Sequence, residues 1–270
     1  MTDRAVDRGG GGAQDAATMR QRHLEILSLL HQKERVGVSE LSALLGASGV
    51  TIRADLTELE SRGLLRRVRG GATRPLLPYT ETSLEESSRH HAAAKRRIGQ
   101  AAAALIRNND TVFLDVGSTT TEIARHLPLT LSAVTVITNG LNIALELERL
   151  PGVRIVVTGG TLRRLQHSLV SPYGLELLSR FRPDKFFLGC NGIDAVQGVT
   201  NSNLEEAEVK TRVVEYSREV IVVADHSKLG QVTAAAVTPL SRVHTLVTDH
   251  RASAAQLTPL REAGLTVVTV

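Results

Sequence analysis

The chain has 270 residues, of which 42% are hydrophobic and 22% charged, with a net charge of +4. This composition is typical of a globular protein with a sizeable core, and no apolar run approaches the ~20 residues that a membrane span needs. Aromatic residues make up only 3%, which argues against single-stranded nucleic-acid binding by base stacking. The single cysteine, Cys190, excludes an internal disulfide and a cysteine-rich zinc site, and it fits a cytoplasmic protein.

The excess positive charge is confined to one block near the N-terminus. Residues 19–74 hold 10 Lys/Arg against 6 Asp/Glu, whereas residues 1–18 hold 2 against 3 and residues 75–270 hold 20 against 19. We therefore expect a disordered Gly-rich tail (1–18), a basic module (19–74), a linker with Pro, Ser and Glu (75–91) and a near-neutral domain (92–270). The basic module indicates a polyanionic partner.

The pattern of the basic module predicts a winged helix-turn-helix. Leucines at three-residue spacing predict a helix over 19–32, and an extended break follows at 36–38. We expect Ser39 to cap a second helix that ends at Gly46, and Ser48 to cap a third helix over 49–61 that Gly63 closes. Residues 64–72 read as two short basic strands around a turn. The alternative is a three-helix bundle without a ligand.

A winged helix of this kind reads double-stranded DNA. The third helix would enter the major groove, where Thr51 and Arg53 reach base edges, and arginines of the wing would contact phosphates. The candidate DNA-binding residues are Ser39, Ser48, Thr51, Arg53, Arg66, Arg67 and Arg69.

From residue 92 onward, helices alternate with continuous Val/Ile/Leu runs. Such runs are typical of strands buried on both faces, so we expect an α/β domain with a parallel or mixed sheet. The expected helices cover 92–107, 119–126, 141–150, 204–217 and 252–263. The expected strands cover 111–116, 134–138, 153–158, 185–188, 220–224, 245–248 and 265–270.

Small polar and Gly-rich turns follow several of these strands, at 115–121, 138–140, 158–161 and 225–228. In open α/β sheets, ligands bind at the carboxyl ends of strands, and a helix that begins there offers free N–H groups to a phosphate. We predict a ligand of sugar-phosphate size, with ordinary loop and capping chemistry as the alternative. The candidate residues are Asp115, Gly117, Ser118, Thr119, Thr120, Thr121, Thr138, Asn139, Gly159, Gly160, Lys210, Asp225, Ser227 and Lys228.

No catalytic residue, metal site or cofactor is predicted. Asp115, Asp225, Glu205, Glu206 and Lys210 offer acid–base chemistry only if they converge, and carboxylates also bind sugar hydroxyls without reaction. No nucleophile elbow or metal-ligand motif is present. We interpret the His90–His91 pair as linker surface, and His226 and Cys190 as structural.

Residues 19–250 resemble the DeoR family of transcriptional regulators. The resemblance rests on Val38–Leu41, Ser48, Thr51–Arg53, Asp55–Leu56, Leu59–Glu60, Gly70–Ala72, Lys95, Ile98, Asp115–Thr120, Thr138–Asn139, Gly159–Gly160, Asp184–Lys185, Lys210 and Asp225–Lys228. It implies a sensor domain related in fold to ribose-5-phosphate isomerases and CoA transferases. It also implies a repressor of sugar-catabolic genes that a phosphorylated sugar or sugar derivative releases, and a homo-oligomer, dimeric or tetrameric.

Two departures from the family pattern and two rival functions remain in view. Arg53-Ala54 stands where the family usually has Arg-Arg, which predicts one base or phosphate contact fewer, and Ser171-Pro172 stands for Gly-Pro. The main rival is a sugar-phosphate isomerase-like enzyme with an accessory winged-helix module, although an isomerase does not need the basic block at 19–74. A winged helix that only binds protein is the weaker rival.

Overall fold

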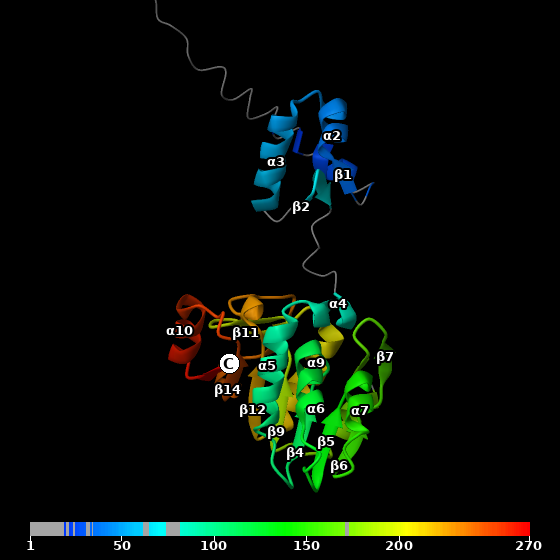
Figure 1. The fold of residues 1–270 in the computed structure, drawn as a ribbon, viewed down its shortest axis with the longest axis vertical. Coiled ribbons are helices and arrows are strands. Elements are labelled where there is room, and N and C mark those ends of the chain that lie inside the picture. The colour runs from blue at the N-terminus through cyan, green and yellow to red at the C-terminus, as the bar shows by residue number, and fades with distance from the viewer. Residues whose placement is uncertain are drawn as a thin grey trace, which may run out of the picture. The chain divides into compact units, whose positions relative to one another are not determined.

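The computed structural model describes residues 35–61, 65–73, 82–170 and 173–270, together with 19, 22–23, 25–30 and 33. The chain forms two compact units, Met1–Thr80 and Glu81–Val270 (Figure 1). The predicted tail, Gly63 and the Ser171-Pro172 departure lie outside the described residues. The last part of the predicted linker belongs to the second unit, where helix α4 (Leu84–Arg89) begins at the capping residue Ser83.

The N-terminal unit is a winged helix-turn-helix, as predicted. Helical residues 25–30 precede the elements β1 (Arg35–Gly37), α2 (Val38–Leu45), α3 (Gly49–Ser61), β2 (Arg66–Val68) and β3 (Gly71–Thr73). The predicted extended break is strand β1, which pairs with β3 and completes a three-stranded antiparallel sheet in the order β1-β3-β2. Apolar side chains of all these helices share one core, which includes Ile26, Leu30, Leu41, Ile52, Leu56 and Leu59.

The predicted cap of the second helix is wrong by two residues. Gly37 is the N-cap of α2, and Ser39 is an exposed residue within the first turn of the helix. The side chain of Glu40 accepts a hydrogen bond from the Gly37 N–H. Because β1 runs directly into the helix, the start is fixed by strand pairing and by this glutamate rather than by a serine hydroxyl.

A seven-stranded parallel sheet forms the centre of the second unit, in the order β15-β14-β12-β9-β4-β5-β6. Its strands are β4 (Thr111–Leu114), β5 (Val134–Thr138), β6 (Val153–Val157), β9 (Lys185–Leu188), β12 (Glu219–Val223), β14 (Thr245–Thr248) and β15 (Thr266–Thr269). The main helices are α5 (Ala92–Ala103), α6 (Ser118–His126), α7 (Leu141–Leu147), α8 (Tyr173–Leu178), α9 (Leu204–Tyr216) and α10 (Ala254–Glu262).

Two apolar cores lie on opposite faces of this sheet. Along β4, Val112 and Leu114 join the core that contains α5, α6 and α7, whereas Phe113 joins the core that contains α8, α9 and α10. This alternation is what a strand covered on both faces requires. The α/β class predicted from continuous apolar runs is confirmed, with helices flanking the strands (Figure 1).

The short antiparallel additions escaped sequence prediction. The hairpin of β7 (Thr161–Arg163) and β8 (Ser168–Val170) follows β6, and β10 (Gly192–Asp194), β11 (Gly198–Asn201) and β13 (Ala235–Thr238) form a small second sheet. Two short 3₁₀ helices, η1 (His226–Lys228) and η2 (Leu240–Arg242), complete the unit. The hairpin joins the end of β5 through a hydrogen bond from the Leu169 N–H to the Asn139 carbonyl at 2.7 Å.

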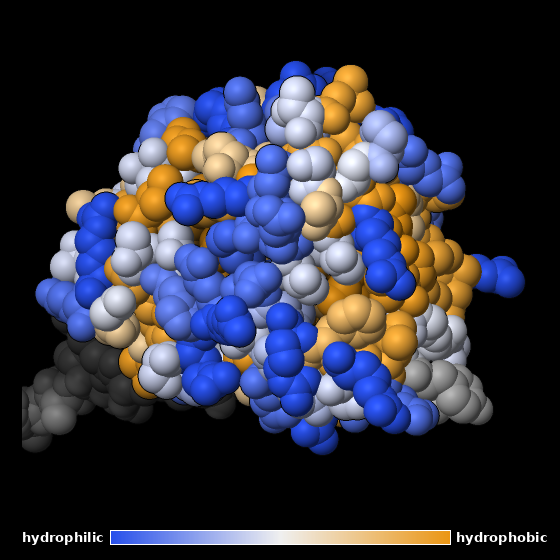
Figure 2. All heavy atoms as spheres, turned by 90° about the horizontal axis from the view of Figure 1, so that it is seen from below, coloured by the Kyte–Doolittle hydropathy of each residue, from blue (hydrophilic) through white to orange (hydrophobic). Residues whose placement is uncertain are grey.

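One end of the second unit has a largely polar surface. Figure 2 shows hydrophilic residues across the middle of this face and apolar residues on both sides of them, with the larger apolar group on the right. Among the described residues, no helix is long and apolar enough to cross a membrane.

Candidate functional site

The start of the recognition helix α3 is built as the sequence predicts. Ser48 Oγ accepts a hydrogen bond from the Thr51 N–H at 3.1 Å and lies 2.8 Å from Thr51 Oγ1. Arg53 is exposed, and its guanidinium donates to the Gly49 carbonyl at 3.3 Å. The cap fixes the first turn, so Thr51 and Arg53 project from an ordered helix end.

The wing arginines are exposed, and one of them is tied to the recognition helix. Arg67 Nη1 donates to Thr57 Oγ1 at 2.8 Å, and the Arg67 N–H donates to Glu60 Oε1 at 2.8 Å. Arg66 and Arg69 are also exposed. The wing is therefore braced against α3, while Arg69 stands at the turn between β2 and β3.

In the second unit, most of the predicted effector residues meet at one edge of the sheet. Asp225 follows β12, Asp115 follows β4, and Asn139 follows β5, all at carboxyl ends of parallel strands. All three are buried. Strand β9 lies between β12 and β4, and its end contributes Gly189 to the same edge.

A buried ion pair joins this edge to helix α9. Lys210 Nζ lies 2.8 Å from Asp115 Oδ2 and donates to the Gly189 carbonyl at 2.9 Å, and the Gly189 N–H donates to Asp115 Oδ2 at 3.0 Å. Burial raises the pKa of Asp115 to about 6, against the opposing effect of Lys210. Burial by itself would lower the pKa of Lys210. The negative charges of Asp115 and Glu206 have the larger effect, so the pKa of Lys210 is raised.

Three buried polar atoms at the carboxyl ends of the strands have no hydrogen-bond partner among the described residues: Asp115 Oδ1, Asn139 Nδ2 and, at the end of β14, Thr248 Oγ1. The other atom of the Asn139 amide, Oδ1, accepts the Val116 N–H at 2.9 Å, and this contact fixes the amide orientation. Because an unpaired buried polar atom costs about 1–3 kcal/mol, a donor and an acceptor left open on neighbouring strands indicate a missing polar ligand.

Helix α6 begins at this edge with a glycine that the backbone requires. Gly117 is the N-cap with φ of 150°, a conformation that favours glycine. Thr120 Oγ1 and Thr121 Oγ1 both donate to the Gly117 carbonyl, at 2.9 and 2.6 Å. These two hydroxyls are used inside the turn, so a ligand here would meet the first backbone N–H groups of α6.

The loop after β12 presents charge to the same edge. Asp225 Oδ1 accepts from the Ser227 N–H at 3.0 Å and from Ser227 Oγ at 2.6 Å. Lys95, from α5, interacts electrostatically with Asp225 and with Lys228. Burial lowers the pKa of Lys95 to about 8. The sequence marked Lys95 only as part of the family resemblance, and its place beside Asp225 comes from the packing of α5.

Gly159 and Gly160 are exposed and lead into the β7–β8 hairpin. A Cβ on Gly160 would lie 2.1 Å from the Val170 carbonyl oxygen, so this glycine is needed for the hairpin to close. Thr138 Oγ1 accepts the Gly140 N–H at 3.0 Å within the neighbouring turn. These three predicted residues shape the loops at the site, and their described contacts are with the chain itself.

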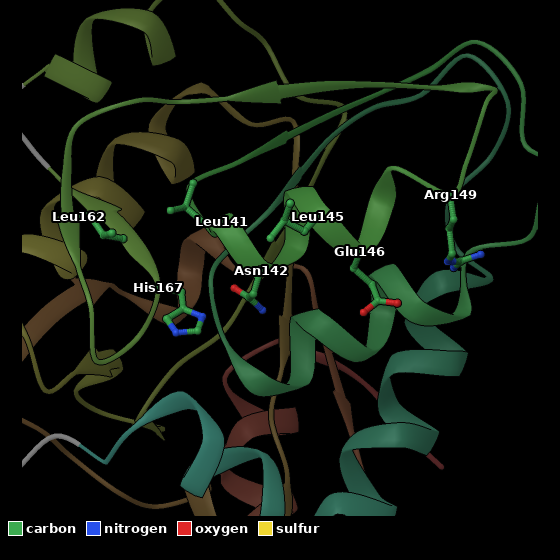
Figure 3. A pocket seen from close by; sticks show the side chains of 7 residues that line it. All are labelled: Leu141, Asn142, Leu145, Glu146, Arg149, Leu162 and His167. Carbon is green, nitrogen blue, oxygen red and sulfur yellow. The ribbon is translucent and has the colours of Figure 1, made fainter.

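An open hollow of about 680 Å³ lies beside this region (Figure 3). Its lining includes Leu141 and Leu145 of α7 and Leu162 of the hairpin, with His167 and Asn142 facing it. Asn142 Nδ2 donates to Thr121 Oγ1 at 2.7 Å, so the hollow borders the α6 turn. Glu146 and Arg149 complete the lining, so the hollow combines apolar with charged side chains.

Three of the five possible acid–base residues come together: Lys210 pairs with Asp115, and Glu206 interacts electrostatically with both. Glu206 is buried and accepts hydrogen bonds from Arg163, Ser168 and Asn201. Glu205 is exposed. Burial raises the pKa of Cys190 to about 11, which keeps the thiol protonated and a poor nucleophile near neutral pH.

Comparisons with known proteins agree with both units. Residues 22–75 match the DeoR-like helix-turn-helix domain, and residues 90–250 match the DeoR C terminal sensor domain. The ribose 5-phosphate isomerase A structure from Methanocaldococcus jannaschii gives a TM-score of 0.37 at 16% identity, over 51% of this chain and 54% of that chain. A likeness of that strength carries no statement about activity.

Relatives match nearly the whole chain. An Escherichia coli O157:H7 protein named for transcriptional repression of the aga operon is 37% identical over 93% of both chains. GlpR of Haloferax volcanii, an HTH-type transcriptional regulator, is 35% identical over 92% of this chain and 96% of its own. The glycerol-3-phosphate regulon repressor of Escherichia coli K12 is 34% identical over 85% of this chain and 90% of its own. These matches favour the regulator over the isomerase-like enzyme, and the chain belongs to the DeoR family of transcriptional regulators.

Proposed function

We propose that this regulator represses sugar-catabolic genes and leaves its operator when a phosphorylated sugar or sugar derivative binds the carboxyl edge of the sensor sheet. Related repressors carry names that refer to glycerol-3-phosphate and to the aga operon. The effector would contact the residues predicted from sequence other than Lys210, with Lys95 added.

The pair of open polar atoms carries this proposal. Asp115 Oδ1 can accept a hydrogen bond and Asn139 Nδ2 can donate one, and both are buried without a partner among the described residues. A sugar hydroxyl both donates and accepts, so adjacent hydroxyls on one ligand would satisfy the two atoms. An apolar ligand would satisfy neither atom.

The phosphate would lie at the start of α6. The first N–H groups of this nine-residue helix have no intrahelical partner, and the helix dipole favours an anion there. Lys95 and Lys228 add positive charge at the same edge. Lys210 is already neutralised by Asp115, so we assign it to holding Asp115 in place.

On the DNA side, Thr51 and Arg53 would read bases, with Ser48 holding the helix end and Arg66, Arg67 and Arg69 contacting phosphates. Ser39, exposed in the first turn of α2, would contact the backbone. We propose a homo-oligomer in the cytoplasm, dimeric or tetrameric, whose recognition helices are spaced about 34–36 Å apart to meet successive major grooves. The effector would favour an arrangement that cannot span them.

A thermal-shift screen tests the proposal. The full chain is heated with a panel of sugar phosphates, with each parent sugar and with inorganic phosphate. A ligand present at 100 times its Kd stabilises the folded state by about 2.7 kcal/mol, so a true effector shifts the melting temperature while its two halves do not. If no sugar phosphate raises the melting temperature, or if inorganic phosphate does so equally, the proposed effector class is wrong.

A further inference from the structure

A cluster of metal-ligand side chains lies where helix α5 begins. His91, Asp225 and His226 each offer one ligand atom, and the three atoms lie within 4.8 Å of one another. The rings of His91 and His226 stand edge to face with centroids 4.7 Å apart. His91 belongs to the pair that the sequence assigned to the linker surface, and it meets the other two residues only through the fold.

His226 is held as metal-binding histidines usually are. Its Nδ1 lies 3.1 Å from both carboxylate oxygens of Asp249, and its backbone N–H donates to Asp249 Oδ1 at 2.8 Å. Asp249 is fully buried, so its carboxylate is held in place behind the ring. A carboxylate behind one ring nitrogen fixes the tautomer, and it leaves Nε2 to a metal.

His91 is placed by an unusual backbone conformation. It is the N-cap of α5 with φ of 54° and ψ of 32°, in the left-handed region that non-glycine residues rarely occupy. Residues held in such conformations cluster at functional sites. The neighbouring residue His90 is not part of the cluster. Its Nε2 lies 3.8 Å from Glu86 Oε1, and both side chains are exposed.

We propose that His91, Asp225 and His226 bind a divalent transition-metal ion of the zinc type. Two imidazoles with one carboxylate suit zinc rather than magnesium or calcium, which prefer all-oxygen sites. Zinc ligands at 2.0–2.2 Å stand roughly 3.3 Å apart in a tetrahedron, so the three atoms must draw together by up to about 1.5 Å. The exposed side chain of His91 can supply that movement.

The charges around the cluster define the fourth ligand. Lys95 interacts electrostatically with Asp225 and with Lys228, and both lysines oppose a cation. The negative charges of Asp225 and Asp249 offset the positive charges of the two lysines. The charge of the metal ion would therefore be offset by a small anion or hydroxide bound as its fourth ligand. The metal would clamp the α4–α5 junction to the loop after β12, and it would share Asp225 with the proposed effector site.

Equilibrium dialysis of the metal-stripped full chain against Zn²⁺ tests the site. We expect one Zn²⁺ per chain, an affinity at least tenfold lower in His91→Ala, and an affinity 10–100-fold lower in Asp249→Asn, which removes only the group behind His226. His90→Ala is the matched control and should bind as the wild type does. The variant at exposed His91 is expected to fold normally, which circular dichroism checks.

Co²⁺ provides a second readout that is independent of stability. Co²⁺ bound by two imidazoles and a carboxylate should show the visible absorption of a site with few ligands. We expect this absorption in the wild type and in His90→Ala, but not in His91→Ala. The proposal is wrong if His91→Ala binds Zn²⁺ with wild-type affinity. It is also wrong if His90→Ala and His91→Ala lose Zn²⁺ affinity equally.

Discussion

Lys210 Nζ lies 2.8 Å from Asp115 Oδ2, and both side chains are buried, at 3% and 0% exposure. The pair ties helix α9 to the end of β4, and it leaves Asp115 Oδ1 without a partner among the described residues. One oxygen of the carboxylate is thus held by the protein, and the other is available to a ligand. The arrangement makes the ion pair a support for the proposed effector site.

Replacing one member of this pair should cost more stability than replacing both. Lys210→Met leaves a buried carboxylate without its cation, and we expect the free energy of unfolding to fall by about 3–5 kcal/mol. Asp115→Asn combined with Lys210→Met removes both charges and should recover most of that loss. Urea denaturation of the two single variants and the double variant measures the coupling. Strictly additive losses would show that the two charges do not interact.

The pKa of Lys95 predicts a pH-dependent contribution to stability. Because burial lowers this pKa from 10.5 to about 8, the unfolded chain binds the proton between these pH values and the folded chain does not. Stability therefore rises with pH across this range, by about 3 kcal/mol at most. Lys95→Met removes the titrating group, so the wild type should gain stability relative to this variant from pH 8 to 10.5. If the difference in unfolding free energy between the wild type and Lys95→Met stays constant over this pH range, the pKa of Lys95 lies near its ordinary value.

The elements that the sequence predicted are those with a strong local signal. The recognition helix and all seven strands of the parallel sheet could be predicted because capping residues, glycines and continuous apolar runs mark them. The three-residue strands β7, β8 and β10 are too short to show a period. The cap of α2 was misplaced because Ser39 is a good capping residue by type, whereas the pairing of β1 decides where the helix starts.

The candidate site could be predicted only in part. The place of Asp115, Asn139 and Asp225 at one edge of the sheet could be predicted because they follow strands whose carboxyl ends must share that edge. The pairing of Asp115 with Lys210, and the approach of Lys95 and His91 to the loop after β12, depend on how helices pack across the sheet. No local pattern in the sequence carries that information.

A negative charge at the start of α6 should abolish the response to the effector. Ser118 is the first residue of α6 and is partly exposed, so Ser118→Glu should fold normally, since an acidic residue in a first turn favours the helix. The new carboxylate would repel the phosphate. Ser118→Gln has the same size without the charge and should keep most of the response. If the same concentration of sugar phosphate releases the operator from Ser118→Glu and from the wild type, the start of α6 does not bind the phosphate.

Two arginines of the DNA-binding unit should have different roles. Arg53→Ala should cost about 1–3 kcal/mol on an operator obtained by selection and should relax specificity at one position, because Arg53 projects from the first turns of α3. Arg69→Ala, at the turn of the wing, should weaken all duplexes equally and lower the salt slope by about one. Filter binding over a salt series separates the two. Equal weakening of specific and non-specific DNA by Arg53→Ala would rule out base reading.

The most direct test of the regulator model is a measurement of effector affinity with and without DNA. The sugar phosphate that gives the largest thermal shift is titrated by calorimetry into the free protein and into the operator complex, and operator affinity is measured with and without that ligand. The model predicts that operator weakens the ligand by the same factor by which the ligand weakens the operator, at least fivefold. Equal ligand affinity for the free protein and the operator complex would contradict it.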